Sequence, residues 1–343
     1  MQRELFGTTP DGHDVHRYTF SAGGVTLRVI NLGGVVTEIH TPDRDGNTAD
    51  VNLGYDTLPP YQKRHPYFGA LVGRIAGRLT DGKFDLDGKS YQLGLNEPGE
   101  ISHIHGGHDG FDQRLWTAEP IDDATLKLTL HSPDGDQGYP GNLDIAVTYK
   151  LTDDGAWTIE YSATTDAPTL VNPTNHAYFN LAGHDSGSIH DHVLQVHATE
   201  NSPARADSVL TGAKHSVDGT VDDMREPVHL ADRIDQLDQQ HGSMYFVSGE
   251  PGTLRPAARL THPATGRSMD VETTESMLQV YTGRNLDGND IGKGGKPYSQ
   301  FGGICLEAHG YPDGIHHPHL GDTVLRPGET YRQTTVYRFG TDG

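Results

Sequence analysis

The regular interruption of the chain by turn-forming residues is the feature that most constrains its fold. The 343 residues include 43 glycines and 20 prolines, which divide the sequence into short segments. Several segments alternate apolar and polar residues at a period of two, as half-buried strands do: 126–130, 145–149 and 157–161. Residues 84–93 are typical of two short strands joined by the turn Asp87-Gly88. The pattern predicts an all-β protein.

Helical periodicity is scarce in this chain. One helix is predicted over about 228–237, because Leu230, Ile234 and Leu237 fall at helical spacing. No break in composition, linker or fixed-period repeat divides the sequence. We therefore expect residues 1–343 to form a single domain, a large sandwich of antiparallel β-sheets.

Charge and cysteine content limit the partners and the compartment. With 47 acidic and 26 basic side chains the formal charge is −21, so phosphate backbones and anionic membranes should repel the chain. We expect no nucleic-acid or membrane partner and a neutral or cationic small ligand. Cys305 is the single cysteine, which excludes an intrachain disulfide. There is neither an apolar signal segment nor a run of about 18 apolar residues, so a soluble cytoplasmic protein is expected. Nothing in the composition selects an oligomeric state.

Three glycine-rich or strand-like segments each carry an ionisable side chain. They are 104–116 with His105, 172–183 with His176, and 302–314 with Glu307. Burying a carboxylate or an imidazole in an apolar strand costs free energy, which natural sequences accept mainly at functional sites. The three segments together indicate proton-transfer chemistry.

Strand periodicity predicts which of these side chains share a face. Three strands are expected to line one cleft with polar rows: His176, Tyr178 and Asn180; Glu307 with Cys305; and Gln279 with Tyr281. Aromatic, amide, carboxylate and imidazole groups suit a sugar, which presents both apolar C–H faces and hydroxyls.

Seven ordered segments give the chain a specific resemblance. It resembles the galactose mutarotase (aldose 1-epimerase) family over almost its whole length, at 73–79, 84–88, 105–107, 132–141, 175–183, 279–283 and 305–307. The resemblance implies a β-supersandwich fold, no metal or organic cofactor, and interconversion of the α and β anomers of free aldoses such as glucose and galactose.

The resemblance also implies roles for individual residues. Glu307 is expected to be the general base, His176 the general acid, and His105 a further histidine beside the sugar. Arg78 and Gln279 are expected to bind the sugar, and Tyr178 can also hydrogen-bond its hydroxyls. At unperturbed pKa values of about 4.3 and 6.5, Glu would be ionised near neutral pH and His could hold a proton.

Other interpretations of the same residues stay open at this point. A lone histidine such as His105 is more often structural than catalytic. Glu307 is also compatible with a buried ion pair to Arg78, and Gln279 and Tyr178 with ordinary cross-strand pairs. The histidines of 189–197 and 315–319 resemble metal-ligand clusters, but we expect solvated imidazoles there.

Three other functions compete with the mutarotase interpretation. The first is a non-catalytic sugar-binding protein or sensor on the same scaffold. The second is a hexose-6-phosphate 1-epimerase, which would need clustered cations such as Arg74 and Arg78 for its phosphate. The third is a metal-dependent sugar isomerase or oxygenase.

Two sugar contacts depart from the family's pattern. Gly77 stands where the family usually has Asn, and segment 239–247 lacks the usual sugar-binding Asp, although Asp238 lies next to it. We therefore expect a high KM and a loose choice between glucose and galactose, with Gly77→Asn lowering KM.

Overall fold

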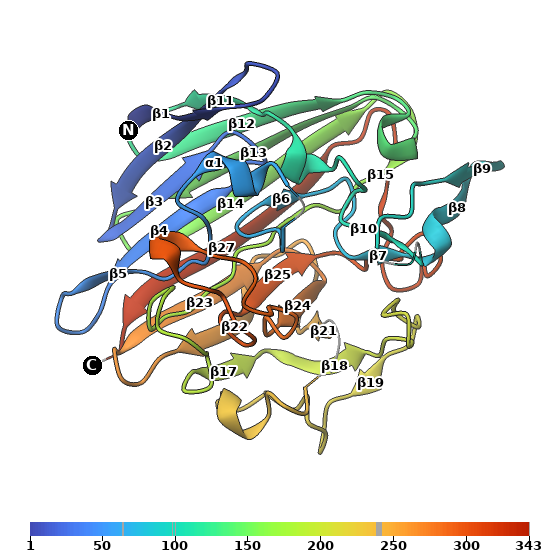
Figure 1. The fold of residues 1–343 in the computed structure, drawn as a ribbon. Coiled ribbons are helices and arrows are strands. Elements are labelled where there is room, and N and C mark those ends of the chain that lie inside the picture. The colour runs from blue at the N-terminus through green and yellow to red at the C-terminus, as the bar shows by residue number, and fades with distance from the viewer. Residues whose placement is uncertain (64, 98, 100, 238–241, 343) are drawn as a thin grey trace.

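Antiparallel β-sheets form most of the regular secondary structure of the protein (Figure 1). The structure, a computed structural model, describes residues 1–63, 65–97, 99, 101–237 and 242–342. One five-stranded sheet is built in chain order from β1 (Gln2–Thr8), β2 (Asp14–Ala22), β3 (Val25–Ile30), β4 (Val36–Pro42) and β5 (Thr48–Asp50).

A nine-stranded sheet is the largest layer. Its spatial order is β11 (Thr117–Pro120), β12 (Thr125–Ser132), β13 (Leu143–Leu151), β14 (Ala156–Thr165), β27 (Tyr331–Thr341), β23 (Arg267–Thr273), β22 (Arg255–Thr261), β17 (Val193–Val196) and β20 (Val228–His229). Strand β27 enters its middle, next to β14, so the last strand of the chain joins the two halves of the sheet.

A second five-stranded sheet carries part of the site described below. Its order is β19 (His215–Ser216), β18 (Ala198–Ser202), β21 (Ser243–Val247), β24 (Met277–Tyr281) and β25 (Cys305–His309). Four short pairs complete the strands: β6 (Leu71–Val72) with β16 (Thr174–Asn175), β7 (Arg78–Leu79) with β10 (His103–Ile104), β8 (Lys83–Leu86) with β9 (Lys89–Gln92), and β15 (Thr169–Leu170) with β26 (Val324–Leu325).

One apolar core draws on all three large sheets. Its buried side chains include Leu27 of β3, Val147 of β13, Tyr337 of β27, and Leu278 and Leu306 of β24 and β25. Strands of this kind bury alternate residues on one face, as the burial of β13 and β14 shows. The predicted all-β class and antiparallel sandwich are confirmed, as are the three alternating strands and the hairpin at 84–93.

Helices are short throughout the described part of the chain. They are α1 (Leu58–Tyr61) and the 3₁₀ turns Thr80–Gly82, Phe111–Gln113, Asp136–Gly138, Leu230–Asp232 and Lys293–Gly295. The predicted helix over 228–237 is therefore wrong. Leu230, Ile234 and Leu237 are buried, as the spacing indicated, but a 3₁₀ turn followed by turns is enough to bury them. None of the helices in the described ranges is long and apolar enough to cross a membrane.

Candidate active site

A cavity of about 360 Å³ brings together all six residues predicted from the sequence. They come from five separate parts of the chain, which carry Arg78, His105, His176 with Tyr178, Gln279, and Glu307. The cavity is also lined by His65, Pro66, Tyr67, Gly77, Ile104, Tyr281, Asn285, Leu286, Asp290 and His309.

Strands β24 and β25 bring Gln279, Tyr281 and Glu307 to the wall of this cavity, whereas Cys305 is not among the lining residues. In their antiparallel register Gln279 lies opposite Glu307, and Tyr281 lies opposite Cys305. The alternate residues of both strands, such as Leu306, point into the apolar core. The predicted faces of these two strands are therefore confirmed.

The segment after β16 keeps the predicted alternation only in part. Strand β16 ends at Asn175, yet the rings of His176 and Tyr178 still stack, with centroids 5.1 Å apart. Phe179 points the other way, into the core. Asn180 was expected to join the polar row, but it is fully buried and its amide donates to the carbonyls of Gly187 and Gly302.

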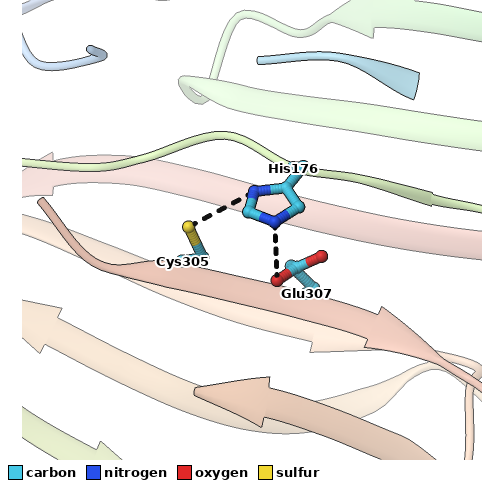
Figure 2. A group of neighbouring side chains, drawn as sticks. All are labelled: His176, Cys305 and Glu307. Carbon is cyan, nitrogen blue, oxygen red and sulfur yellow. Dashed lines mark hydrogen bonds and ion pairs between the residues drawn. The ribbon is translucent and has the colours of Figure 1, made fainter. Parts of the chain in front are cut away.

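His176 and Glu307 lie next to each other in the lining of the cavity (Figure 2). The distance from His176 Nε2 to Glu307 Oε1 is 3.6 Å, and both side chains are almost fully buried. Burial raises the pKa of Glu307 to about 8 and lowers the pKa of His176 to about 3. Near neutral pH, when the cavity is empty, Glu307 is therefore protonated and His176 is a neutral imidazole. The expectation of an ionised Glu and a protonated His, based on unperturbed pKa values, is wrong for this state.

Cys305 contacts the other nitrogen of His176. Its Sγ lies 3.5 Å from His176 Nδ1 (Figure 2). Burial, followed by the nearby Glu307, raises the pKa of the Cys305 thiol well above its usual value, so it stays protonated and can donate to Nδ1. The neutral imidazole then carries its hydrogen on Nε2, facing Glu307. The possible ligand atoms of these three residues lie within 4.8 Å of one another, although a protonated thiol is a poor metal ligand.

His105 occupies a backbone conformation that few residues adopt. Its φ is +52°, and the N–H of Gly77 donates to its Nδ1 at 3.1 Å. Desolvation and the neighbouring His176 and Arg78 hold the pKa of His105 well below its usual value. A neutral imidazole that accepts at Nδ1 carries its hydrogen on Nε2 and can donate it to a ligand.

Gly77 is closely packed in this arrangement. Its φ is +73°, and a Cβ atom there would lie 2.7 Å from Cγ of Pro312. Asn at this position would require Pro312 to move. Lower KM in Gly77→Asn therefore remains a prediction that depends on this shift.

Arg78 binds a carboxylate other than Glu307. Its Nε lies 2.9 Å from both carboxylate oxygens of Glu97. The alternative of a buried Glu307–Arg78 pair is thus not the arrangement found. Arg74, the other cation of this motif, is 2% exposed and donates to Ser132 and to neighbouring carbonyls of 133–141.

Sequence reasoning missed several residues of the cavity wall. The ring of Tyr67 lies 4.7 Å from that of His105 and 5.8 Å from that of His176. Tyr67 is in a loop at φ +61°, and no periodic pattern marks it. His309 lies two residues after Glu307 on β25, so strand alternation could have found it.

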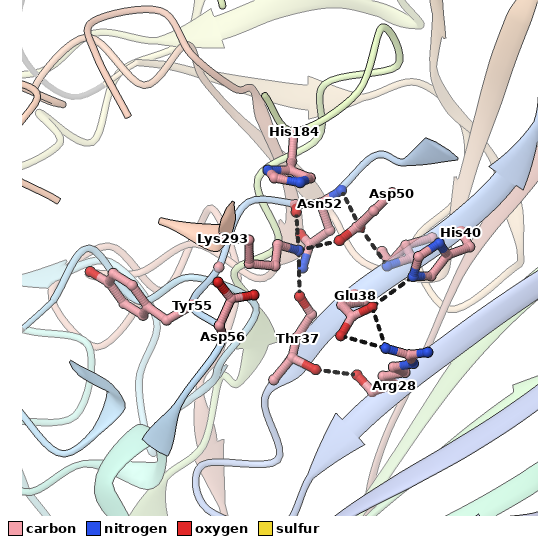
Figure 3. Close-up of polar contacts among 12 residues, drawn as sticks. Arg28, Thr37, Glu38, His40, Asp50, Asn52, Tyr55, Asp56, His184 and Lys293 are labelled. Carbon is pink, nitrogen blue, oxygen red and sulfur yellow. Dashed lines mark hydrogen bonds and ion pairs between the residues drawn. The ribbon is translucent and has the colours of Figure 1, made fainter. Parts of the chain in front are cut away.

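The loop after β24 closes one side of the cavity and is held by a buried lysine (Figure 3). Lys293 is 4% exposed, and its Nζ donates to the carbonyls of Thr37 and Asn52, both at 2.7 Å. It also pairs with Asp50. This anchor ties the loop to the first sheet.

The histidine-rich segments differ from the expectation in one respect. His192 is fully buried rather than solvated, and it bonds to Asp191 and accepts from the N–H of Leu181. Asp191 also bonds to His262, so these three residues form a second group with metal-ligand spacing. A third such group is Glu38, His40 and Asp50. Segment 239–247 lacks the family's usual sugar-binding Asp. Its first residues, 239–241, and the neighbouring Asp238 lie outside the described residues.

Comparison with known proteins identifies the family of this chain. The family model for aldose 1-epimerase matches residues 16–338. Galactose mutarotase of Homo sapiens is 38% identical over 340 residues, covering 99% of this chain and 98% of that protein. Aldose 1-epimerase of Escherichia coli is 33% identical over 347 residues, covering 99% of both. An aldose epimerase homologue from C. elegans superposes with a TM-score of 0.88 at 26% identity, covering 95% of this chain and 99% of that one. The chain therefore belongs to the aldose 1-epimerase family.

Proposed function

We propose that the protein is an isomerase, an aldose 1-epimerase that interconverts the α and β anomers of free aldohexoses such as glucose and galactose. The observation that carries the proposal is the buried pair His176–Glu307, 3.6 Å apart in the cavity of a chain that belongs to this family. We further propose that residues 1–343 form one domain that acts in the cytoplasm, where the free thiol of Cys305 would stay reduced.

Ring opening needs two proton transfers. Glu307 takes the proton of the anomeric hydroxyl O1 while His176 gives a proton to the ring oxygen O5. The C1–O5 bond breaks and leaves an aldehyde at C1, which turns about the C1–C2 bond. Reclosure on the other face reverses both transfers, so no net proton is consumed. Acid or base groups of this kind each contribute roughly 10²- to 10⁴-fold to the rate.

The remaining residues hold the sugar during the turn. Arg78, oriented by Glu97, and the Nε2–H of His105 supply donors to hydroxyls. Gln279 and Tyr178 lie on neighbouring parts of the same wall. These side chains carry the reaction without a metal or organic cofactor in the proposed mechanism.

The competing functions fit the cavity less well. A hexose-6-phosphate would need free cations, whereas Arg74 is buried in its own bonds and Arg78 is neutralised by Glu97. A sensor would have no need of a buried acid and base facing each other. The names of the relatives, galactose mutarotase and aldose 1-epimerase, support a catalyst for free sugars.

Polarimetry on freshly dissolved α-D-glucose and α-D-galactose tests the proposal. We expect the protein to accelerate mutarotation equally well with and without EDTA. Activity that is lost in EDTA and restored by zinc or iron would instead favour a metal site at His176, Cys305 and Glu307. No acceleration of either sugar would contradict the proposed function.

Variants of the pair test the assigned roles. Glu307→Gln should lower kcat by on the order of 10²-fold or more, while sugar binding largely survives. His176→Ala should lose a comparable factor, and the two losses should not add. His105→Ala should affect both kcat and KM. Glu275→Gln is a matched control, because burial also raises the pKa of Glu275, to about 7, outside the cavity. Nearly unchanged turnover in Glu307→Gln would overturn its assignment as the base.

A further inference from the structure

Asp290 is a lining residue of the active-site cavity, and no step above uses it. It lies in the loop after β24, together with Asn285 and Leu286 of the same wall. Tyr55, which is not among the lining residues, donates its hydroxyl to Oδ1 of Asp290. Among the described residues no other hydrogen bond holds the second oxygen, Oδ2, so it remains a free acceptor.

The loop holds this carboxylate in a fixed position. The backbone N–H of Tyr298 donates to the carbonyl of Asp290 at 2.9 Å. Three residues further on, Lys293 ties the loop to the first sheet, and the N–H of Gly294 donates to Asp56 at 2.7 Å (Figure 3). A carboxylate held in this way is ready to accept a hydrogen bond, since little side-chain freedom is left to lose on binding.

Asp290 also sets the charge of the cavity. Burial lowers the pKa of His65 to about 4 and of His309 to about 4, and it lowers the pKa of His176 as well, so these imidazoles are neutral near pH 7. Glu307 holds its proton, and Arg78 is balanced by Glu97. The charge of Asp290 is therefore left unbalanced among the described lining residues.

We propose that Asp290 binds a hydroxyl of the sugar and makes the cavity selective for neutral and cationic aldoses over anionic ones. The favoured class comprises free hexoses and protonated amino sugars, and the disfavoured class comprises uronic acids and sugar phosphates. This inference rests on the proposed mutarotase function and adds to it a substrate charge and a binding residue.

Asp290 acts on binding rather than on proton transfer. The pKa shift of Glu307 arises from burial alone, and that of His176 arises from burial and neighbouring histidines. Neither shift includes Asp290, so removing its charge leaves the pair's proton affinity in place. Removing the Asp290 carboxylate should therefore change KM and the choice of substrate.

The test compares Asp290→Asn with the wild-type protein on three probes at pH 6: D-galactose, D-galactosamine and D-galacturonate. We expect KM for galactose to rise about tenfold, as for a hydrogen bond to a charged group, with kcat within about twofold. The ratio of kcat/KM for galactosamine to that for galacturonate should fall by at least about threefold, because the attraction and the repulsion both disappear.

Two further variants separate this role from a structural one. Asp287→Asn is the matched control: it removes a carboxylate from the same loop, but one that bonds to Asn289 and lies outside the cavity lining. It should change neither KM nor the ratio. Tyr55→Phe removes the hydroxyl that orients Asp290 and should raise KM by a smaller factor, with the ratio kept.

The outcomes distinguish the inference from the proposed function. An inactive wild-type protein would refute the mutarotase proposal itself. An active wild-type protein whose KM and charge ratio are unchanged in Asp290→Asn would overturn the role of Asp290 alone. Equal changes of KM and of the charge ratio in Asp290→Asn and Asp287→Asn would show that the loop tolerates no change of charge. This result too would overturn the role of Asp290.

Discussion

Replacing Glu307 by Gln should stabilise the folded protein while it removes the base. Burial raises the pKa of Glu307 to about 8, whereas the same carboxyl in an unfolded chain titrates at about 4.3. Between these pH values the folded state keeps a proton that the unfolded state has released. Because the unfolded state binds fewer protons, the free energy of unfolding falls as pH rises across this window. Gln has no proton to lose and avoids that loss.

The magnitude at pH 7 follows from the distance to the unfolded pKa. That pKa lies about 2.7 units below pH 7, and each unit corresponds to about 1.4 kcal/mol, so Glu307 lowers stability by about 4 kcal/mol. An unfolding entropy of about 2.1 cal/mol/K per residue gives about 0.7 kcal/mol/K for 343 residues. The Tm of Glu307→Gln should thus rise by about 5 °C.

Thermal unfolding of both proteins at pH 5, 7 and 8 checks this reasoning. The gap in Tm should be small at pH 5 and widen towards pH 8. Glu38→Gln is a control of opposite sign. Burial would raise the pKa of Glu38, but hydrogen bonds from His40 and Arg28 outweigh it and lower that pKa to about 2. Its stabilising contribution is present above about pH 4.5, so the substitution should lower Tm at pH 7. A lower Tm in Glu307→Gln, or a gap that is constant with pH, would refute the argument.

Three further outcomes are expected. After subtraction of the spontaneous rate, kcat/KM should stay level through neutral pH and fall as pH rises through about 8, because Glu307 then ionises and the pair loses its proton. A fall centred near pH 6.5 would contradict the shifted pKa values of Glu307 and His176. Lys293→Met leaves Asp50 buried without its cation and should cost about 3–5 kcal/mol in urea unfolding, with a higher KM; an unchanged midpoint would argue against the anchor. A lysine at position 78 cannot make two parallel hydrogen bonds to Glu97, so Arg78→Lys should raise KM by about tenfold at similar kcat. An unchanged KM would contradict a role of this pairing in sugar binding.

Strand periodicity predicted the part of the site that lies on regular strands. Glu307 and Gln279 were placed correctly because β24 and β25 alternate strictly between core and cavity. The same reasoning failed for Asn180, because the segment after β16 leaves the regular strand conformation. The helix expected at 228–237 failed for a related reason: three apolar residues at helical spacing are satisfied by a 3₁₀ turn and the turns after it.

The loop residues of the cavity could not be predicted from local pattern. Asp290 meets Tyr55 across a separation of 235 residues, and Lys293 meets Thr37 across 256. Such contacts depend on how the whole sandwich closes. The pKa shifts could not be predicted from local pattern either, because the burial that causes them comes from sheets whose strands lie far apart in the sequence.

The proton of the His176–Glu307 pair connects burial with the proposed chemistry. In the empty cavity burial favours a protonated Glu307 and a neutral His176. This is also the arrangement after ring opening, when Glu307 has taken the O1 proton and His176 has given its own to O5. The closed sugar needs the opposite arrangement, an ion pair, which attraction across 3.6 Å favours. The Cys305 thiol is compatible with both arrangements. Its S–H can donate to Nδ1 of the neutral His176, and its sulfur can accept from the Nδ1–H of the protonated His176. The two arrangements hold the same total charge, so in this mechanism the cavity neither takes up nor releases a proton as the sugar opens and recloses.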